Sequence, residues 1–127
     1  MWLVVAHGSR VSEVVAAHEQ VCDAIAEQAG AEAKVRPAYL EITEPSIPVA
    51  IDAAVAEGAR TVVMVPYFLH VGRHILGDLP QLLAAAAERH PDVEFALADH
   101  LGFDRRLVEV AVDRARAALS EASEVES

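Results

Sequence analysis

Strand-like and helix-like segments alternate along this chain of 127 residues, and this alternation limits the fold more than any other feature. Trp2 to Ala6 is a continuous apolar run of strand length, which is typical of a strand covered on both faces of a sheet. Further strands are predicted at Lys34 to Leu40, Thr61 to Val65 and Val93 to Ala98. A helical pattern follows each of them, so the order is β-α-β-α-β-α-β-α.

The helices are predicted from apolar spacing and from residues that are typical of helix ends. They are expected to run from a cap at Ser12 to Gly30, from Thr43 to Gly58, from Asp78 to the residue before His90, and from Asp104 to about Leu119. Because each crossover is long enough for a helix, the strands must be parallel, with right-handed connections. Pro37 indicates that the second strand lies at an edge. The sequence therefore predicts a three-layer α/β domain with an open four-stranded parallel sheet flanked by helices.

Length and charge limit the organisation and the partners. Residues 1–120 form one domain of ordinary size, and residues 121–127 are expected to be an acidic, disordered tail. The net charge of −10 argues against nucleic acid or an anionic membrane as a partner. No apolar stretch approaches the ~20 residues that span a bilayer, and no basic segment precedes the first strand, so we expect a cytoplasmic protein. The single cysteine, Cys22, fits a buried position on a helix.

Ligands of open parallel sheets bind at the carboxyl ends of the strands, so residues just after each strand are candidates for a site. His7 ends the first strand and is followed by Gly8, and Glu41 follows the second strand. Pro66 to Gly77 follows the third strand, and Asp99-His100 follows the fourth. The candidate residues therefore gather at one edge of the sheet.

The segment after the third strand, Pro66 to Pro80, is too long for an ordinary connection between a strand and a helix. It combines two histidines, an arginine, two glycines and apolar side chains. This mixture suits a flat apolar ligand with charged edges, and the alternative is a mobile surface loop without a ligand.

The histidines favour an open metal site over a closed one. The spacings of structural zinc sites are absent, and H-E-x-x-H is missing. A site of two imidazoles suits a metal ion that is handed on rather than stored, and imidazole binds iron, cobalt, nickel and zinc. Neither a G-x-G-x-x-G motif, a P-loop nor a G-x-S-x-G turn is present, which disfavours nucleotide binding and a serine nucleophile.

Four blocks of the chain resemble the sirohydrochlorin chelatases, the small class II chelatases of the cobalamin and sirohaem pathways. The blocks are Val4 to Arg10; Tyr39 to Glu41 with Glu44 to Ser46; Val65 to Leu69 with Gly72 to His74 and Asp78 to Pro80; and Leu101 to Leu107. They cover nearly the whole chain in order. The resemblance implies a chelatase-like half domain.

This resemblance also implies an activity and a site. The family inserts Co²⁺, Fe²⁺ or Ni²⁺ into sirohydrochlorin without ATP, and members of this length resemble half of longer duplicated enzymes and pair as homodimers. By resemblance His7 is a metal ligand and proton acceptor, His74 is the second metal ligand, and Glu41 is a catalytic residue. Residues expected to contact the tetrapyrrole are Ser9, Arg10, Glu41, Leu69, His70, Val71, Gly72, Arg73 and His74. No cofactor beyond the substrate metal is expected.

The residue types fit this chemistry. Histidine titrates near neutral pH, so an imidazole can hold a metal ion or accept a pyrrole proton. Glu41 could share in the proton transfer or balance the metal charge, or simply be a carboxylate near a helix N-terminus. Arg10 and Arg73 flank the two histidines and can bind carboxylates, which predicts a basic mouth on an acidic protein.

The other histidines do not determine which metal ion the site would take. His70 and His100 depart from the family pattern and are interpreted as exposed residues, with a wider metal-binding set as the alternative. His18 and His90 are assigned no role. The His-rich segment of nickel-specific relatives is absent, which favours cobalt or iron.

Two rival functions remain at this point. The first is a non-catalytic carrier of a tetrapyrrole or a metal, and the second is a structural domain that kept the fold and lost the chemistry. The presence of both His7 and His74 argues against the second.

Overall fold

The computed structural model describes residues 1–126 and contains one four-stranded sheet in which all strands are parallel. The strands are β1 (Trp2–Ala6), β2 (Val35–Tyr39), β3 (Thr61–Pro66) and β4 (Glu94–Leu97), in the spatial order β2-β1-β3-β4. The four predicted strands are confirmed, and each observed strand end lies within one residue of its predicted position. The edge position of β2, predicted from Pro37, is also confirmed.

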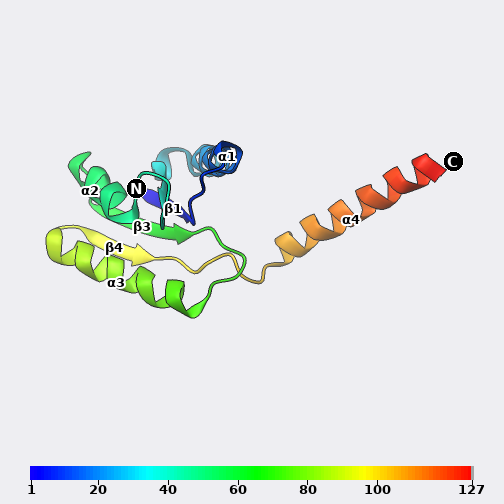
Figure 1. Cartoon of the computed structure of the whole chain (residues 1–127). Helices are drawn as coiled ribbons and strands as arrows, with labels where there is room; N and C mark the ends of the chain where they lie inside the picture. Colours follow the sequence, from blue (N-terminus) through cyan, green and yellow to red (C-terminus); the bar gives the residue numbers. More distant parts are fainter. Residues whose placement is uncertain (127) are drawn as a thin grey trace.

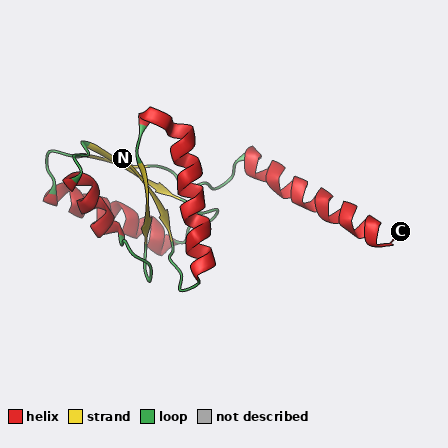
Figure 2. Cartoon of the chain, turned by 90° about the horizontal axis from the view of Figure 1, so that it is seen from above, coloured by secondary structure: helices red, strands yellow, loops and turns green. Residues whose placement is uncertain are grey.

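Helices cover both faces of the sheet. These helices are α1 (Ser12–Ala29), α2 (Ile47–Ala56) and α3 (Arg73–Arg89). A short 3-10 helix, η1 (Gly30–Glu32), follows α1, and the last helix, α4 (Arg105–Glu126), does not lie on the sheet. Helix α1 lies on one face, and α2 and α3 lie together on the other (Figure 1 and Figure 2). The predicted three-layer α/β fold is confirmed.

The alternation of side chains along β1 supplies both halves of the core. Leu3 and Val5 are fully buried against α2 and α3, in a cluster that includes Ile51 of α2. Val4 points to the opposite face and packs with Cys22 of α1. The buried position predicted for the cysteine is confirmed, and burial, with smaller contributions from nearby acidic side chains, raises the pKa of its thiol to about 11.

Two predicted helix starts were placed wrongly. Ser12 is the first residue of α1 and not its cap, because Val11 holds the extended cap position and its N–H donates to the Ser9 hydroxyl (3.0 Å). Helix α2 begins at Ile47 and not just after Thr43, and the Ser46 hydroxyl accepts the N–H of its third residue.

The start of α3 was also predicted too late in the chain. The helix begins at Arg73 with Gly72 as its extended N-cap, so the loop after β3 is only residues 67–72. Pro80, which follows the predicted cap Asp78 by two residues, lies in the interior of the helix. His74 therefore lies in the first helical turn and not on a long loop.

Helix α4 starts as predicted and ends later than expected. The Asp104 carboxylate accepts the Arg106 N–H (2.9 Å), and the Arg106 side chain holds the pKa of that carboxyl down at about 2. The helix continues to Glu126, so residues 121–126 are helical and not the predicted disordered tail, while residue 127 lies outside the described residues.

Unlike the other helices, α4 does not lie on the sheet but projects away from it (Figure 1). Across the described part of the chain, none of the helices has both the length and the apolar character needed to cross a membrane.

Candidate active site

A cavity of about 450 Å³ opens at the carboxyl edge of the sheet, where the ends of β1 and β2 face helix α3. Its wall contains three titratable side chains of different origin: His7 follows β1, Glu41 follows β2, and Asp78 belongs to α3. Four further side chains complete it: Leu40, Ile75, Gln81 and Leu82. The volume falls in the range of pockets that bind small organic ligands.

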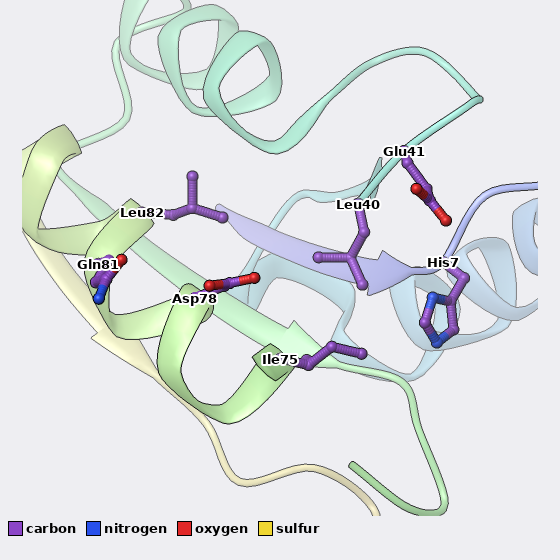
Figure 3. A pocket seen from close by; sticks show the side chains of 7 residues that line it. All are labelled: His7, Leu40, Glu41, Ile75, Asp78, Gln81 and Leu82. Atoms are coloured by element: carbon purple, nitrogen blue, oxygen red, sulfur yellow. The ribbon is translucent and has the colours of Figure 1, made fainter. Parts of the chain in front are cut away.

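The His7 ring is exposed at the end of a buried strand. It meets the Phe68 ring edge-on, with 5.0 Å between the ring centroids and 73° between the ring planes. Phe68 itself is buried, so it provides a fixed apolar support for the imidazole. Figure 3 shows the Glu41 carboxylate directed to the same side of the cavity as the His7 ring.

Backbone hydrogen bonds hold His7 and Glu41 next to each other. The Leu40 N–H donates to the Ala6 carbonyl and the Glu41 N–H to the His7 carbonyl, each at 3.0 Å, so the β1–β2 pairing extends past both strand ends. Gly8 follows with φ +99°, and a β-carbon at this position would overlap with the carbonyl oxygen of Glu41. Only glycine lets the two loops approach this closely.

A second set of bonds fixes the loop that carries Glu41. The Thr43 hydroxyl accepts the Ser9 N–H (2.8 Å) and donates to the Ser9 carbonyl (3.0 Å). The Thr43 N–H donates to the Glu41 carbonyl (2.6 Å), which closes a three-residue turn around Ile42 at φ +67°. A β-branched residue rarely adopts this left-handed conformation, so the loop is strained beside a candidate catalytic residue.

Helix α3 supplies the opposite wall through residues spaced at helical intervals. Ile75, Asp78 and Leu82 are separated by three and four residues and therefore share the face turned towards the cavity. In Figure 3 the Asp78 carboxylate projects into the cavity from this face. Since successive helical residues turn by about 100°, His74 falls between Asp78 and Gln81 around the axis, one turn nearer the helix N-terminus.

The structure brings together only part of the predicted site. His7 and Glu41 line one cavity, whereas His74 lies on the cavity face of α3 with an exposed side chain that is not part of the wall. Ser9 acts through the bonds that join its loop to Thr43. The remaining predicted contacts with a tetrapyrrole are not part of the cavity wall: Arg10, Leu69, His70, Val71, Gly72 and Arg73.

Two further histidines, His18 and His100, lie outside the cavity wall. His18 is buried on α1, where its Nε2 atom lies 2.9 Å from the Val4 carbonyl oxygen and its ring meets Tyr39 and Tyr67 edge-on. His100 lies in the loop after β4, with its Nε2 atom 3.2 Å from the position that a β-carbon on Gly102 would take. Within residues 1–126, no three His, Cys, Asp or Glu side chains are grouped closely enough to hold a metal ion together.

Sequence reasoning missed five side chains of the cavity wall, Leu40, Ile75, Asp78, Gln81 and Leu82, and the support from Phe68. Asp78 was interpreted as a helix cap because the start of its helix was predicted at least five residues too late in the chain. With a start at Gly72, the spacing of four residues between His74 and Asp78 would have indicated a shared helix face.

A family model with the description CbiX matches residues 1–118. The chloroplastic sirohydrochlorin ferrochelatase of Arabidopsis thaliana is 36% identical over 118 residues, which cover 93% of this chain and 52% of that protein. The sirohydrochlorin cobaltochelatase of Sulfolobus acidocaldarius is 32% identical over 118 residues, which cover 93% of this chain and 91% of that protein.

Solved structures agree in fold. A putative cobalamin biosynthesis CbiX protein from Marinobacter aquaeolei has a TM-score of 0.82 at 25% identity, covering 97% of each chain. SirB, the sirohydrochlorin chelatase of Bacillus subtilis subspecies spizizenii in complex with cobalt, has a TM-score of 0.74 at 29% identity, covering 91% of this chain and 49% of that one. The chain thus spans about half of the Arabidopsis and Bacillus proteins and nearly all of the Sulfolobus protein.

Proposed function

The chain belongs to the CbiX family, and from this we propose that it inserts a divalent metal ion, Co²⁺ or Fe²⁺, into sirohydrochlorin without ATP. The observation that carries the proposal is the position of His7 and Glu41 side by side at the mouth of an apolar-walled cavity. The names of the relatives include both cobaltochelatases and ferrochelatases. They support the substrate class and are consistent with either metal ion.

Metal insertion exchanges one M²⁺ ion for two protons on pyrrole nitrogens, so the site must bind a cation and remove protons. The His7 imidazole first holds the incoming metal ion. After the metal has passed to the unprotonated nitrogens of the macrocycle, the freed ring nitrogen accepts the two pyrrole protons one after the other. The Glu41 carboxylate beside it takes the proton onward to solvent, to which both side chains are exposed. The Asp78 carboxylate on the opposite wall offsets the positive charge of the metal while the protons leave.

The macrocycle lies in the cavity with one edge against Leu40 and Ile75, because these side chains provide the apolar surface between the charged groups. Its carboxylate rim meets the exposed guanidinium groups of Arg10 and Arg73, which bind carboxylates through paired N–H donors.

His74 serves as the second metal-binding histidine in this proposal. Its position one turn before Asp78, on the cavity face of α3, supports a role in receiving the metal at the entrance, outside the wall that holds the macrocycle. A His74→Ala variant should then raise the metal concentration needed for half-maximal rate, whereas His7→Ala should lower the maximal rate itself.

We also propose that two copies form the active protein. This chain covers about half of the Arabidopsis and Bacillus relatives, so a second copy would supply a region of the length that a single copy lacks. A cytoplasmic location stays a prediction from the sequence.

The test is an absorbance assay with purified protein, sirohydrochlorin and Co²⁺ or Fe²⁺ in catalytic and in stoichiometric amounts of protein. We expect many turnovers per chain and a fall of at least 100-fold for His7→Ala, with His90→Ala as a matched control far from the cavity. Insertion limited to one equivalent would indicate a carrier, and no acceleration with either metal would overturn the proposal.

A further inference from the structure

His18 on α1 is a buried histidine that the proposed chemistry does not use, and it is only 7% exposed. Its Nε2 atom lies 2.9 Å from the carbonyl oxygen of Val4 in β1. A carbonyl oxygen can only accept a hydrogen bond, so this ring nitrogen carries the hydrogen and donates it. The imidazole is therefore tied to the central strand that leads to His7.

The same imidazole also contacts the two strands that flank β1. Its ring meets Tyr39, the last residue of β2, with 5.5 Å between the ring centroids and 64° between the ring planes. It meets Tyr67, the first residue after β3, at 6.0 Å and 61°. Both are edge-on contacts of the kind that aromatic rings prefer. One side chain of α1 thus joins the carboxyl ends of three neighbouring strands.

The three strands end in one row of side chains beneath this imidazole. Ala6 is the register partner of Tyr39, and Tyr67 comes one residue after Pro66, the partner of Val5. Residues in register point to the same face of a sheet, so Ala6 lies between the two tyrosines. Its small side chain leaves space above the central strand for the imidazole.

The next residue of each segment turns to the opposite face, where the cavity lies. These residues are His7, Leu40 and Phe68. Two of them line the cavity, and the Phe68 ring supports the His7 ring. The row that carries the candidate chemistry therefore directly follows, along each segment, the row that the buried imidazole holds together.

From this geometry we infer that His18 is a positioning residue for metal insertion. By tying the last row of the sheet together on one face, it keeps His7 and Glu41 at their required spacing on the other. The inference rests on the proposed function. Cys22 provides the comparison, because it lies one turn further along the same face of α1 and packs with Val4 and Val35 away from the strand ends.

The first test is amide hydrogen exchange of the His18→Leu variant, which keeps an apolar side chain but loses the donor. Three amides report on the strand ends, because they donate to the carbonyls of residues 5–7: Leu40, Glu41 and Tyr67. We expect them to exchange about fivefold faster or more, while Trp2 and Val63, bound at the other end of the sheet, keep their rates. Unchanged exchange at the strand ends, or an equal rise at both ends of the sheet, would overturn the inference.

The second test is the rate of Co²⁺ insertion into sirohydrochlorin by the same variant. We expect kcat to fall by about 10- to 100-fold with both KM values unchanged, because a small displacement affects the reacting groups more than binding. His18→Gln, whose amide can donate to the same carbonyl, should recover most of kcat. Cys22→Ala should lose stability and keep kcat. A full kcat in His18→Leu, or an equal fall in Cys22→Ala, would contradict a positioning role.

A variant at a less buried position tests the same contact where folding is not at stake. Tyr67 is 38% exposed, and Tyr67→Leu removes the edge-on contact with β3 but leaves the hydrogen bond to Val4. It should lower kcat about threefold, and an unchanged kcat would count against the inference. No turnover by the original protein would count against the proposed function alone, because the exchange experiment needs no substrate.

Discussion

The α-carbon of Gly8 lies so close to the carbonyl oxygen of Glu41 that no β-carbon fits between them. This contact joins the loop that follows His7 to the loop that carries the neighbouring carboxylate. It makes the spacing of two candidate catalytic residues depend on the absence of one side chain.

Gly8→Ala should therefore destabilise the protein by about 3 kcal/mol or more, through an unfavourable φ of about 1–2 kcal/mol and a collision with backbone. The matched control is Gly58→Ala, because Gly58 has the same φ of +99° but no atom within 4 Å of the added carbon. Urea unfolding of both variants separates the two contributions. Equal losses of stability would show that the loops move apart freely.

Relief of the backbone strain at Ile42 should increase the stability of the fold. Asparagine tolerates positive φ better than a β-branched residue, and the Ile42 side chain is 59% exposed, so Ile42→Asn should stabilise the fold by about 1 kcal/mol. Val14→Asn, at an exposed position of α1 with ordinary helical geometry, should give no such gain. Denaturant midpoints measure the difference, and an equal or lower stability of the Ile42→Asn variant would contradict the idea of stored strain.

The thiol of Cys22 should be inert in the native state. Burial raises its pKa to about 11, so only a small fraction is thiolate at pH 8, and the sulfur is also shielded from solvent. Reaction with a disulfide reagent should be at least ~100-fold slower than in urea, given a pKa shift of about two units. A Cys22→Ala protein with Glu13→Cys at an exposed site of α1 should react at once, and equally fast labelling of native Cys22 would contradict the buried position.

Protonation of Asp52 should lower the stability of the folded protein in acid. The hydrogen bond from His90, and then that from Arg89, lowers the pKa of the Asp52 carboxyl and joins α2 to the end of α3. A lowered folded pKa gives stability above the ordinary carboxyl value near 4 and loses it as the pH falls through the lowered value.

Because these groups are largely exposed, Asp52→Asn should cost about 0.5 kcal/mol at pH 7. The difference in stability between the variant and the original protein should disappear as the pH falls through the lowered pKa of Asp52. Asp92→Asn provides the exposed control. A gap that persists in acid would show that the carboxylate charge is not what holds the two helices.

The strands were predictable because each is a short apolar run bounded by turn residues, and β3 is the clearest case. Helix starts were less predictable, since they depend on which of several polar residues takes the extended cap position. Thr43 and Asp78 are both good caps by type, but Thr43 is bound to Ser9 and Asp78 is the sixth residue of α3.

The site was predictable where it follows directly from a strand end. His7 and Glu41 were identified because residues after parallel strands meet at one edge. The wall contributed by α3 was not identified, because it requires the correct start of that helix. The projection of α4 away from the sheet could not be predicted from the sequence, since every helix of an α/β domain is expected to cover its own sheet.

The cavity has one rigid wall and one that can yield. His7 follows β1, a strand that is hydrogen-bonded on both sides, while α3 begins at Arg73 after an N-cap, Gly72, that has no side chain to cap it, and contains Gly77 and Pro80 in its interior. Amide protons of β1 should therefore exchange with solvent last and those of residues 73–78 among the first. Opening of these turns would widen the cavity while the imidazole keeps its place, so a ligand larger than the closed cavity could enter and leave without unfolding of β1.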